Sequence, residues 1–143
     1  MEGEFYIATE REKMDIPFIH KYLSENSYWA KGRTMELVLK SMENSLCFGV
    51  FNKKDQQVAF ARLVTDYVVF AWLMDVFVDS EYTSQGIGKM LVRHIVQLPE
   101  LRNVNGIGLR TNDAHGFYEK FGFEKISEPQ TWMLRKNKGE VRN

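Results

Sequence analysis

Two glycines separated by one residue, Gly86 and Gly88, stand between an apolar run (residues 68–78) and an amphipathic one (residues 88–98). Because glycine has no Cβ, it leaves backbone N–H groups open at a helix start, where the helix dipole is positive. Lys89 and Arg93, four residues apart, lie on one side of that helix. Cations there oppose the dipole unless an anion lies between them. The pattern predicts an anion site; the alternative is a tight turn followed by two solvated cations.

Two common phosphate-binding motifs do not fit these glycines. The dinucleotide fingerprint GxGxxG requires a third glycine where this chain has Leu91. The P-loop pattern GxxxxGK[ST] requires Ser or Thr where it has Met90, and an upstream glycine where it has Thr83. The sequence therefore excludes both motifs, and an anion would be bound by local backbone geometry.

Asp75 is a carboxylate in the middle of the apolar run VVFAWLMDVFV. Burying a carboxylate without a partner costs several kcal/mol, so we expect Asp75 either to face a cleft or to have a partner. The alternatives to a catalytic role are a salt bridge, for which Arg62 on the neighbouring strand is a candidate, and a hydrogen bond that fixes the sheet.

The elements that must position these residues follow from periodicity and capping residues. Asp15 and Thr34 are expected to cap the first two helices. Strands are expected over residues 4–11, 46–52, 58–66, 68–78, 106–111 and 131–136, and helices over 15–27, 35–45, 88–98 and 113–122. The three central strands read as an antiparallel meander. The order β-α-α-β-β-β-α-β-α-β predicts the α+β class with a mixed, mostly antiparallel sheet flanked by helices.

The composition indicates one globular domain over residues 1–143, with a frayed tail from about residue 136. Nineteen basic residues balance nineteen acidic ones, so no overall field favours nucleic acid or an anionic membrane. Cys47, the single cysteine, stands in an apolar run and is expected to be a buried, inert thiol. No signal peptide begins the chain, and the longest apolar run is too short to span a bilayer, so a cytoplasmic location is expected.

A second segment, LRTNDAHGFYEKFGFE (residues 109–124), reads as strand, turn, short helix, glycine and strand. Together with VDSEYTSQGIG (residues 78–88), it resembles the two signatures of the GCN5-related N-acetyltransferase (GNAT) superfamily. In that family the first signature is Q/R-x-x-G-x-G/A before a helix, and the second is roughly N-x-x-A-x-x-F-Y-x-x-x-G-F. The chain departs from them at Thr83, in the usual Gln/Arg position, and at Thr111, in the usual Asn position. The order of elements also matches along nearly the whole chain.

The resemblance implies the acyl-CoA N-acyltransferase fold, with acetyl-CoA as the acetyl donor. The backbone near Phe77 and Val78 is implied to face the thioester oxygen, and Gln85 is a candidate to compensate for Thr83. The residues implied to bind the cofactor are Val76, Phe77, Val78, Thr83, Ser84, Gln85, Gly86, Ile87, Gly88, Lys89, Thr111, Asn112, Phe117 and Tyr118.

The chemistry of acetyl transfer suggests catalytic roles for two residues, Tyr118 and Asp75. A neutral amine must attack the thioester, and the departing thiolate must gain a proton. Tyr118 occupies the position of the family's tyrosine and is implied as the general acid; its alternative role is a core aromatic. Asp75 is the candidate base. Tyr28, Trp29 and Arg33 are predicted to form an aromatic wall with an anion anchor for the acceptor, or else to cover the edge of the core.

The predicted function is direct transfer of acetyl from acetyl-CoA to a primary amine of a small molecule or peptide. Cys47 is badly placed for a covalent intermediate. A catalytically silent acyl-CoA-binding or regulatory module on the same fold, and a small α+β interaction domain, are the alternatives. No metal, nucleic acid or membrane partner is expected, and a homodimer is left open.

Overall fold

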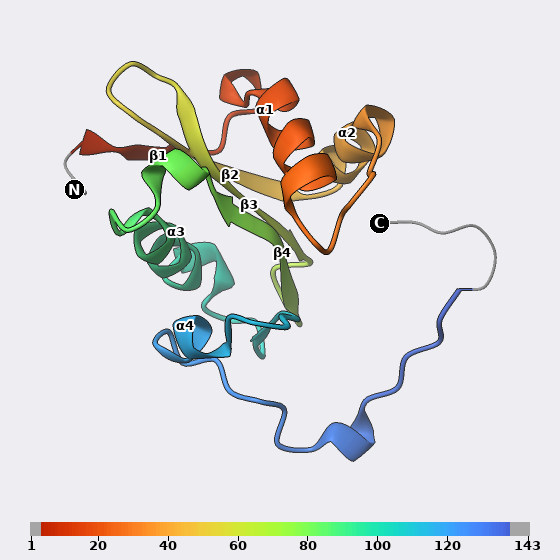
Figure 1. The fold of residues 1–143 in the computed structure, drawn as a ribbon. Coiled ribbons are helices and arrows are strands. Elements are labelled where there is room, and N and C mark those ends of the chain that lie inside the picture. Colours follow the sequence, from red (N-terminus) through yellow and green to blue (C-terminus); the bar gives the residue numbers. More distant parts are fainter. Residues whose placement is uncertain (1–3, 138–143) are drawn as a thin grey trace.

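The computed structural model describes residues 4–137 and contains a five-stranded sheet between two layers of helices (Figure 1). The strands are β1 (Tyr6–Ala8), β2 (Leu46–Phe51), β3 (Gln57–Thr65), β4 (Ala71–Val78) and β5 (Ile107–Gly108). They follow chain order across the sheet, antiparallel from β1 to β4, and β5 runs parallel to β4. The predicted α+β class and the mixed, mostly antiparallel sheet are therefore confirmed.

The helices cover both faces of the sheet. The α-helices are α1 (Ile16–Lys21), α2 (Met35–Glu43), α3 (Ile87–Val96) and α4 (His115–Glu119). A π-helical turn, η3 (Tyr22–Asn26), extends α1, and 3-10 turns occupy η2 (Arg11–Lys13), η4 (Ser80–Tyr82), η5 (Pro99–Leu101) and η6 (Pro129–Thr131). Figure 1 shows α1 and α2 on one face of the sheet, and α3 and α4 on the other.

Local sequence accounts for where the main helices begin and which side they bury. The side chain of Asp15 accepts a hydrogen bond from the backbone N–H of Phe18, and that of Thr34 accepts one from Leu37, so both predicted N-caps are confirmed. In α3, Ile87, Leu91 and Ile95 recur every fourth residue and are buried against the sheet.

A β-bulge in β4 lets side chains before and after it face different hydrophobic cores. Between the pairs Arg62↔Met74 and Phe60↔Phe77, β4 has one residue more than β3. The extra length coincides with Asp75, whose φ of 54° lies in the left-handed region that aspartate tolerates better than most residues. As a result Leu73 packs with the α3 core, whereas Phe77 packs with the core under α1 and α2.

The last predicted strand, over residues 131–136, is wrong for the single chain. η6 covers Pro129–Thr131, and residues 132–137 form no strand and are exposed. The strand expected over 106–111 is only the two residues of β5, because pairing with β4 stops after Trp72↔Gly108. Most of the predicted frayed tail, residues 138–143, lies outside the described residues.

Candidate functional site

The glycine turn forms an uncapped helix start. Gly86 is the N-cap of α3 with φ 80°, and no side chain accepts a hydrogen bond there. Ser84 also has a positive φ, 69°. A Cβ on Gly86 would meet no heavy atom within 4 Å, so this side of the turn is open. Open N–H groups at the positive end of a ten-residue helix suit an anion.

The two signature segments meet behind this turn. A Cβ on Gly88 would lie 3.5 Å from the ring of Phe117 and 3.7 Å from Val78. Residues from the end of β4, the start of α3 and α4 therefore come together, as the resemblance predicts. Thr83 is exposed and its hydroxyl donates to the carbonyl of Ser80 (3.3 Å). Lys89 and Arg93 line a hollow of about 400 Å³ with Lys120.

Asp75 lies at the centre of a buried ion cluster. Its Oδ2 accepts from Arg33 (2.8 Å) and from Nε of Arg62 (2.9 Å), and its Oδ1 accepts from Nε1 of Trp29 (2.9 Å). Asp75 is 5% exposed. Burial alone would raise the pKa of its carboxyl group, but the two guanidinium groups outweigh burial and the pKa is lowered. The salt bridge to Arg62, one of the alternatives to a catalytic role, is present. The role of Asp75 as general base remains a prediction. Its lowered pKa disfavours that role, because it makes the carboxylate a weaker base.

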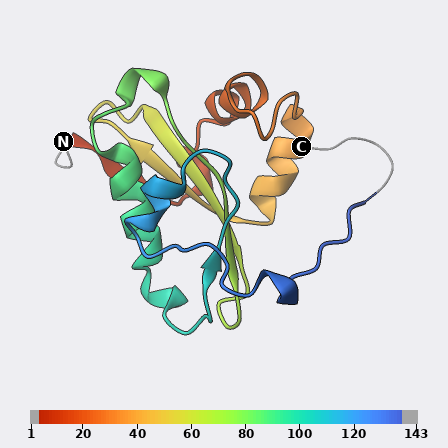
Figure 2. The same ribbon diagram turned by 60° about the horizontal axis from the view of Figure 1, so that its bottom comes forward.

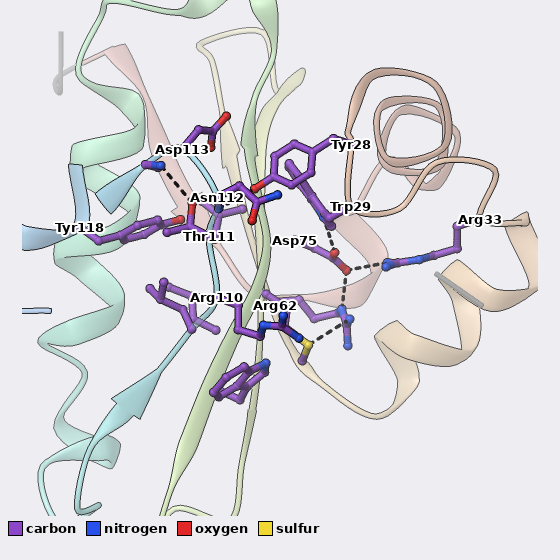
Figure 3. Close-up of a pocket in the computed structure, with 16 residues that line it drawn as sticks. Tyr28, Trp29, Arg33, Arg62, Asp75, Arg110, Thr111, Asn112, Asp113 and Tyr118 are labelled. Carbon is purple, nitrogen blue, oxygen red and sulfur yellow. Dashed lines mark hydrogen bonds and ion pairs between the residues drawn. The ribbon is translucent and has the colours of Figure 1, made fainter. Parts of the chain in front are cut away.

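A pocket of about 510 Å³ opens where β4 and the chain after β5 separate (Figure 3). Tyr118 reaches in from α4, and Tyr28, Trp29 and Arg33 come from the segment between η3 and α2. Most predicted acceptor and thioester residues therefore share one cavity. The pocket is lined by Tyr28, Trp29, Arg33, Arg62, Trp72, Leu73, Met74, Asp75, Val76, Leu109, Arg110, Thr111, Asn112, Asp113, Ala114 and Tyr118.

A hydrogen bond joins the two walls of this pocket, and a second one holds the turn on one side of it. The backbone N–H of Asn112 donates to the hydroxyl of Tyr28 (3.1 Å), and the Thr111 hydroxyl accepts from the N–H of Ala114 (3.1 Å). The Tyr28–Asn112 bond ties the loop before α2 to the segment after β5 at the pocket rim. Thr111 is engaged in holding the turn into α4.

Tyr118 is held as a neutral phenol. Burial, with smaller contributions from Tyr28 and Asp113, raises its pKa to about 12. The hydroxyl is therefore protonated throughout the physiological range and is available as a donor in the pocket.

Three residues of the site have surroundings that the sequence alone did not indicate. The ring of Phe77 stacks on the ring of Tyr22 in the core, with their centroids 4.0 Å apart. Only the backbone of Phe77 is therefore available to a ligand. Arg33, predicted as the anion anchor, is 7% exposed and bonded to Asp75. Arg110, which the sequence reasoning missed, is exposed and lines the same pocket. Its position directly before Thr111, where the second signature begins, is the feature of the sequence that could have indicated a place in the site.

In the described part of the chain, neither Cys47 nor a group of metal-ligating side chains adds a reactive centre to the site. The Cys47 thiol is buried and its pKa is raised to about 11, chiefly by burial. Among residues 4–137 no group of three His, Cys, Asp or Glu side chains could hold a metal ion. Within the same range no helix is long and apolar enough to cross a membrane.

Comparisons with known proteins agree with this geometry. A model of the acetyltransferase (GNAT) domain matches residues 43–125. The peptidyl-lysine N-acetyltransferase YjaB of Salmonella typhimurium is 34% identical over 124 residues, which cover 86% of this chain and 77% of YjaB. A GNAT-family protein from Xanthomonas campestris pv. campestris has a crystal structure with a TM-score of 0.89 and 39% identity over 93% of each chain. Rv2747 from Mycobacterium tuberculosis, solved in complex with CoA and NLQ, shares the fold at a TM-score of 0.70 and 16% identity, over 85% of this chain and 73% of that one.

Proposed function

Because the chain belongs to the GCN5-related N-acetyltransferase family, we propose that it transfers the acetyl group of acetyl-CoA directly to a primary amine. The observation that carries the proposal is the pocket with Tyr118, which is also lined by Met74, Asp75 and Val76 of β4, the strand that leads to the open helix start at Gly86. An acyl donor with a pyrophosphate at one end and a thioester at the other suits this arrangement. The transfer needs no covalent enzyme intermediate, in keeping with the burial of Cys47.

The chain offers a matching group for each part of acetyl-CoA. The backbone N–H groups at the start of α3 would bind the pyrophosphate, with Lys89 nearby. Among the residues that the structure describes, β4 pairs with β5 only as far as Trp72, so its later backbone groups on that side are available to the amide-bearing pantetheine arm. N–H groups around Val76, Phe77 and Val78 would stabilise the thioester oxygen.

Proton transfer falls to Tyr118 in this proposal. When the amine nitrogen bonds the acetyl carbon, the carbon–sulfur bond breaks and the thiolate takes the Tyr118 proton. The proton lost by the amine then returns to the phenolate through water. Asp75, already bonded to three donors, would act by positioning Trp29 and Arg33 at the pocket wall.

The charges of the pocket indicate the kind of acceptor. Three arginines and two aspartates line it, and both Arg33 and Arg62 are bonded to Asp75. Arg110 is the exposed member of the three. We therefore propose an acceptor whose amine is accompanied by an anionic group that binds Arg110, with Tyr28 and Trp29 as an aromatic wall. A free amino acid or a peptide carrying a carboxylate fits this description.

The enzyme proposal is tested by thiol release when the protein is mixed with acetyl-CoA and a panel of amines. Turnover above hydrolysis for at least one amine is expected. If coenzyme A raises the melting temperature but no amine is acetylated, the chain is the silent acyl-CoA-binding module instead. If coenzyme A has no effect on melting, both the donor and the reaction are wrong.

For the acceptor, we expect Arg110→Gln to raise KM for an anionic amine by about 10- to 100-fold, the value of a charge-assisted hydrogen bond. KM for acetyl-CoA should stay unchanged, because Arg110 lies in the acceptor pocket. Arg102→Gln, an exposed arginine after η5, is the matched control and should change neither constant. An equal loss for anionic and neutral amines would contradict the anchor.

For the glycine turn, we expect Gly86→Ala to cost about 1 kcal/mol of stability, because alanine is strained at φ 80°. Its methyl group would also enter the open side of the turn, so the shift in melting temperature caused by coenzyme A should shrink. Gly116→Ala, a helical glycine with open space around its Cβ, is the control. It should stabilise the fold by about 0.5–1 kcal/mol and leave the coenzyme A shift intact. Equal coenzyme A shifts in both variants would remove Gly86 from the donor site.

A further inference from the structure

A second hollow, a groove of about 500 Å³, lies beside the acceptor pocket. It is formed by β5 and by the chain that leaves α4, which Figure 2 shows passing β5 on its way to η6. The groove and the pocket share part of their lining, including Arg110, Thr111, Asn112 and Tyr118. A thioester held beside Tyr118 can therefore be approached by an amine from either hollow.

The turn after α4 brings a lysine into this groove. Gly122, with a φ of 91°, turns the chain in the left-handed conformation that glycine adopts readily. The backbone N–H of Phe123 then donates to the carbonyl of Tyr118 (3.4 Å), and the Phe123 ring packs edge-on against the Tyr118 ring, with their centroids 5.7 Å apart. Lys125 follows two residues later and lines the groove. The turn therefore places Lys125 in the same groove as the proposed general acid.

Lys125 differs in this respect from the other lysines. Of the lysines that the structure describes, only Lys125 lines the groove or the acceptor pocket. Its side chain is exposed, and the ion pairs of the described residues do not include its ammonium group. Phe70, Trp72 and Ile126 give the groove apolar walls on which the aliphatic stem of a lysine can pack. The groove thus holds a primary amine, which is the acceptor class of the proposed reaction.

We propose that the chain acetylates the side-chain amine of its own Lys125. This inference rests on the proposed function, because it uses the same donor and the same Tyr118. The Lys125 ammonium group loses a proton to water, its nitrogen bonds the acetyl carbon, and the carbon–sulfur bond breaks. The thiolate takes the Tyr118 proton, the nitrogen gives its next proton to water, and the phenolate regains a proton from water. The products are the neutral amide, coenzyme A as the thiol, and a proton.

The placement of Lys125 has a kinetic and an electrostatic consequence. Because the amine and the donor site belong to one chain, attack is a step within one complex and needs no encounter between two protein molecules. The rate constant should therefore be independent of protein concentration. Acetylation also removes the positive charge of Lys125. Among the described residues, Arg110 is then the only arginine or lysine with a charge in the groove.

Mass spectrometry of the full chain, incubated with acetyl-CoA and no added amine, tests the proposal. The native chain should gain the mass of one acetyl group, and peptide mapping should place it on Lys125. Lys125→Arg should gain an acetyl group at least about 10-fold more slowly, because it lacks the positioned amine. Its thiol release with the panel of amines should stay within about twofold of native, since residue 125 is exposed.

Two further variants serve as controls. Lys136→Arg replaces another exposed lysine after α4 and should still be acetylated at Lys125. Tyr118→Phe should slow acetylation of Lys125 by about 100-fold, the lower end of what a general acid contributes. Uncatalysed acetylation by the donor would not respond to the loss of the Tyr118 hydroxyl.

Three results would overturn the self-acetylation. In the first, the native chain acetylates an added amine but leaves Lys125 unmodified, so that the proposed function stands without this inference. In the second, Lys125 and Lys136 are modified equally fast in the native chain and in Tyr118→Phe, which indicates uncatalysed acetylation. In the third, the rate constant rises with protein concentration, because the transfer then runs between two copies. A chain that modifies neither Lys125 nor any added amine would contradict the proposed function as well.

Discussion

Tyr118→Phe is expected to lower kcat by about 100-fold, the lower end of what a general acid contributes. The variant loses only the hydroxyl, so the ring can still pack against Phe117 and Phe123. The dissociation constant of coenzyme A should therefore stay within about twofold, an allowance for surface-like changes of under 0.5 kcal/mol. Steady-state kinetics with one acceptor and a thermal shift with coenzyme A measure the two effects separately.

Tyr28→Phe is the matched control for Tyr118→Phe. It removes another hydroxyl of the same pocket, the one that accepts from the N–H of Asn112. It should change KM for the acceptor more than kcat. If both variants reduce kcat equally, the Tyr118 hydroxyl shapes the pocket and does not donate the proton. If kcat of Tyr118→Phe matches that of the native protein, the proton comes from elsewhere.

Asp75→Asn is expected to lower the free energy of unfolding by about 3–5 kcal/mol, because it removes the buried charge with which two buried guanidinium groups are paired. Asparagine accepts the left-handed backbone of position 75, so the change isolates the charge from the bulge. Denaturant unfolding measures the loss. Asp113→Asn, an exposed aspartate of the same pocket, is the control and should change stability by less than about 0.5 kcal/mol.

The effect of Asp75→Asn should also depend on pH. The folded-state pKa of Asp75 is lowered, so its contribution is complete above the unfolded value of about 3.9 and is lost as pH falls through the folded value. The stability difference between native and variant proteins should therefore narrow only in acid below about pH 4. A difference that is unchanged down to the acid transition would show that packing, and not charge, is lost.

Short-range patterns predicted the fold where local chemistry decides the structure. The caps at Asp15 and Thr34, the buried stripe of α3 and the antiparallel meander all depend on residues close in sequence. They were correct because nothing distant competes with them. The same reasoning named Arg62 as a candidate partner of Asp75, since an apolar strand cannot bury a lone carboxylate, and the two side chains do form an ion pair.

What failed depends on contacts between distant segments. Nothing near Arg33 in the sequence shows that its guanidinium reaches Asp75, 42 residues away. The bulge at Asp75 is visible only in the β3–β4 register. The strand expected over residues 131–136 has the right composition, but a strand also needs a partner, and among residues 4–137 none pairs with this segment. The hydrophobic periodicity of a segment predicts the secondary structure of that segment, but it does not identify the segment that packs or pairs with it.

The left-handed backbone of Asp75 leaves position 75 without an acceptable replacement. Asparagine and glycine fit a φ of 54° but remove the charge that Arg33 and Arg62 require. Glutamate keeps the charge, but it fits the left-handed region poorly and its longer side chain would displace the carboxylate. Since every exchange gives up the backbone or the charge, the pocket wall around the aspartate can be changed by substitution far more easily than the aspartate itself.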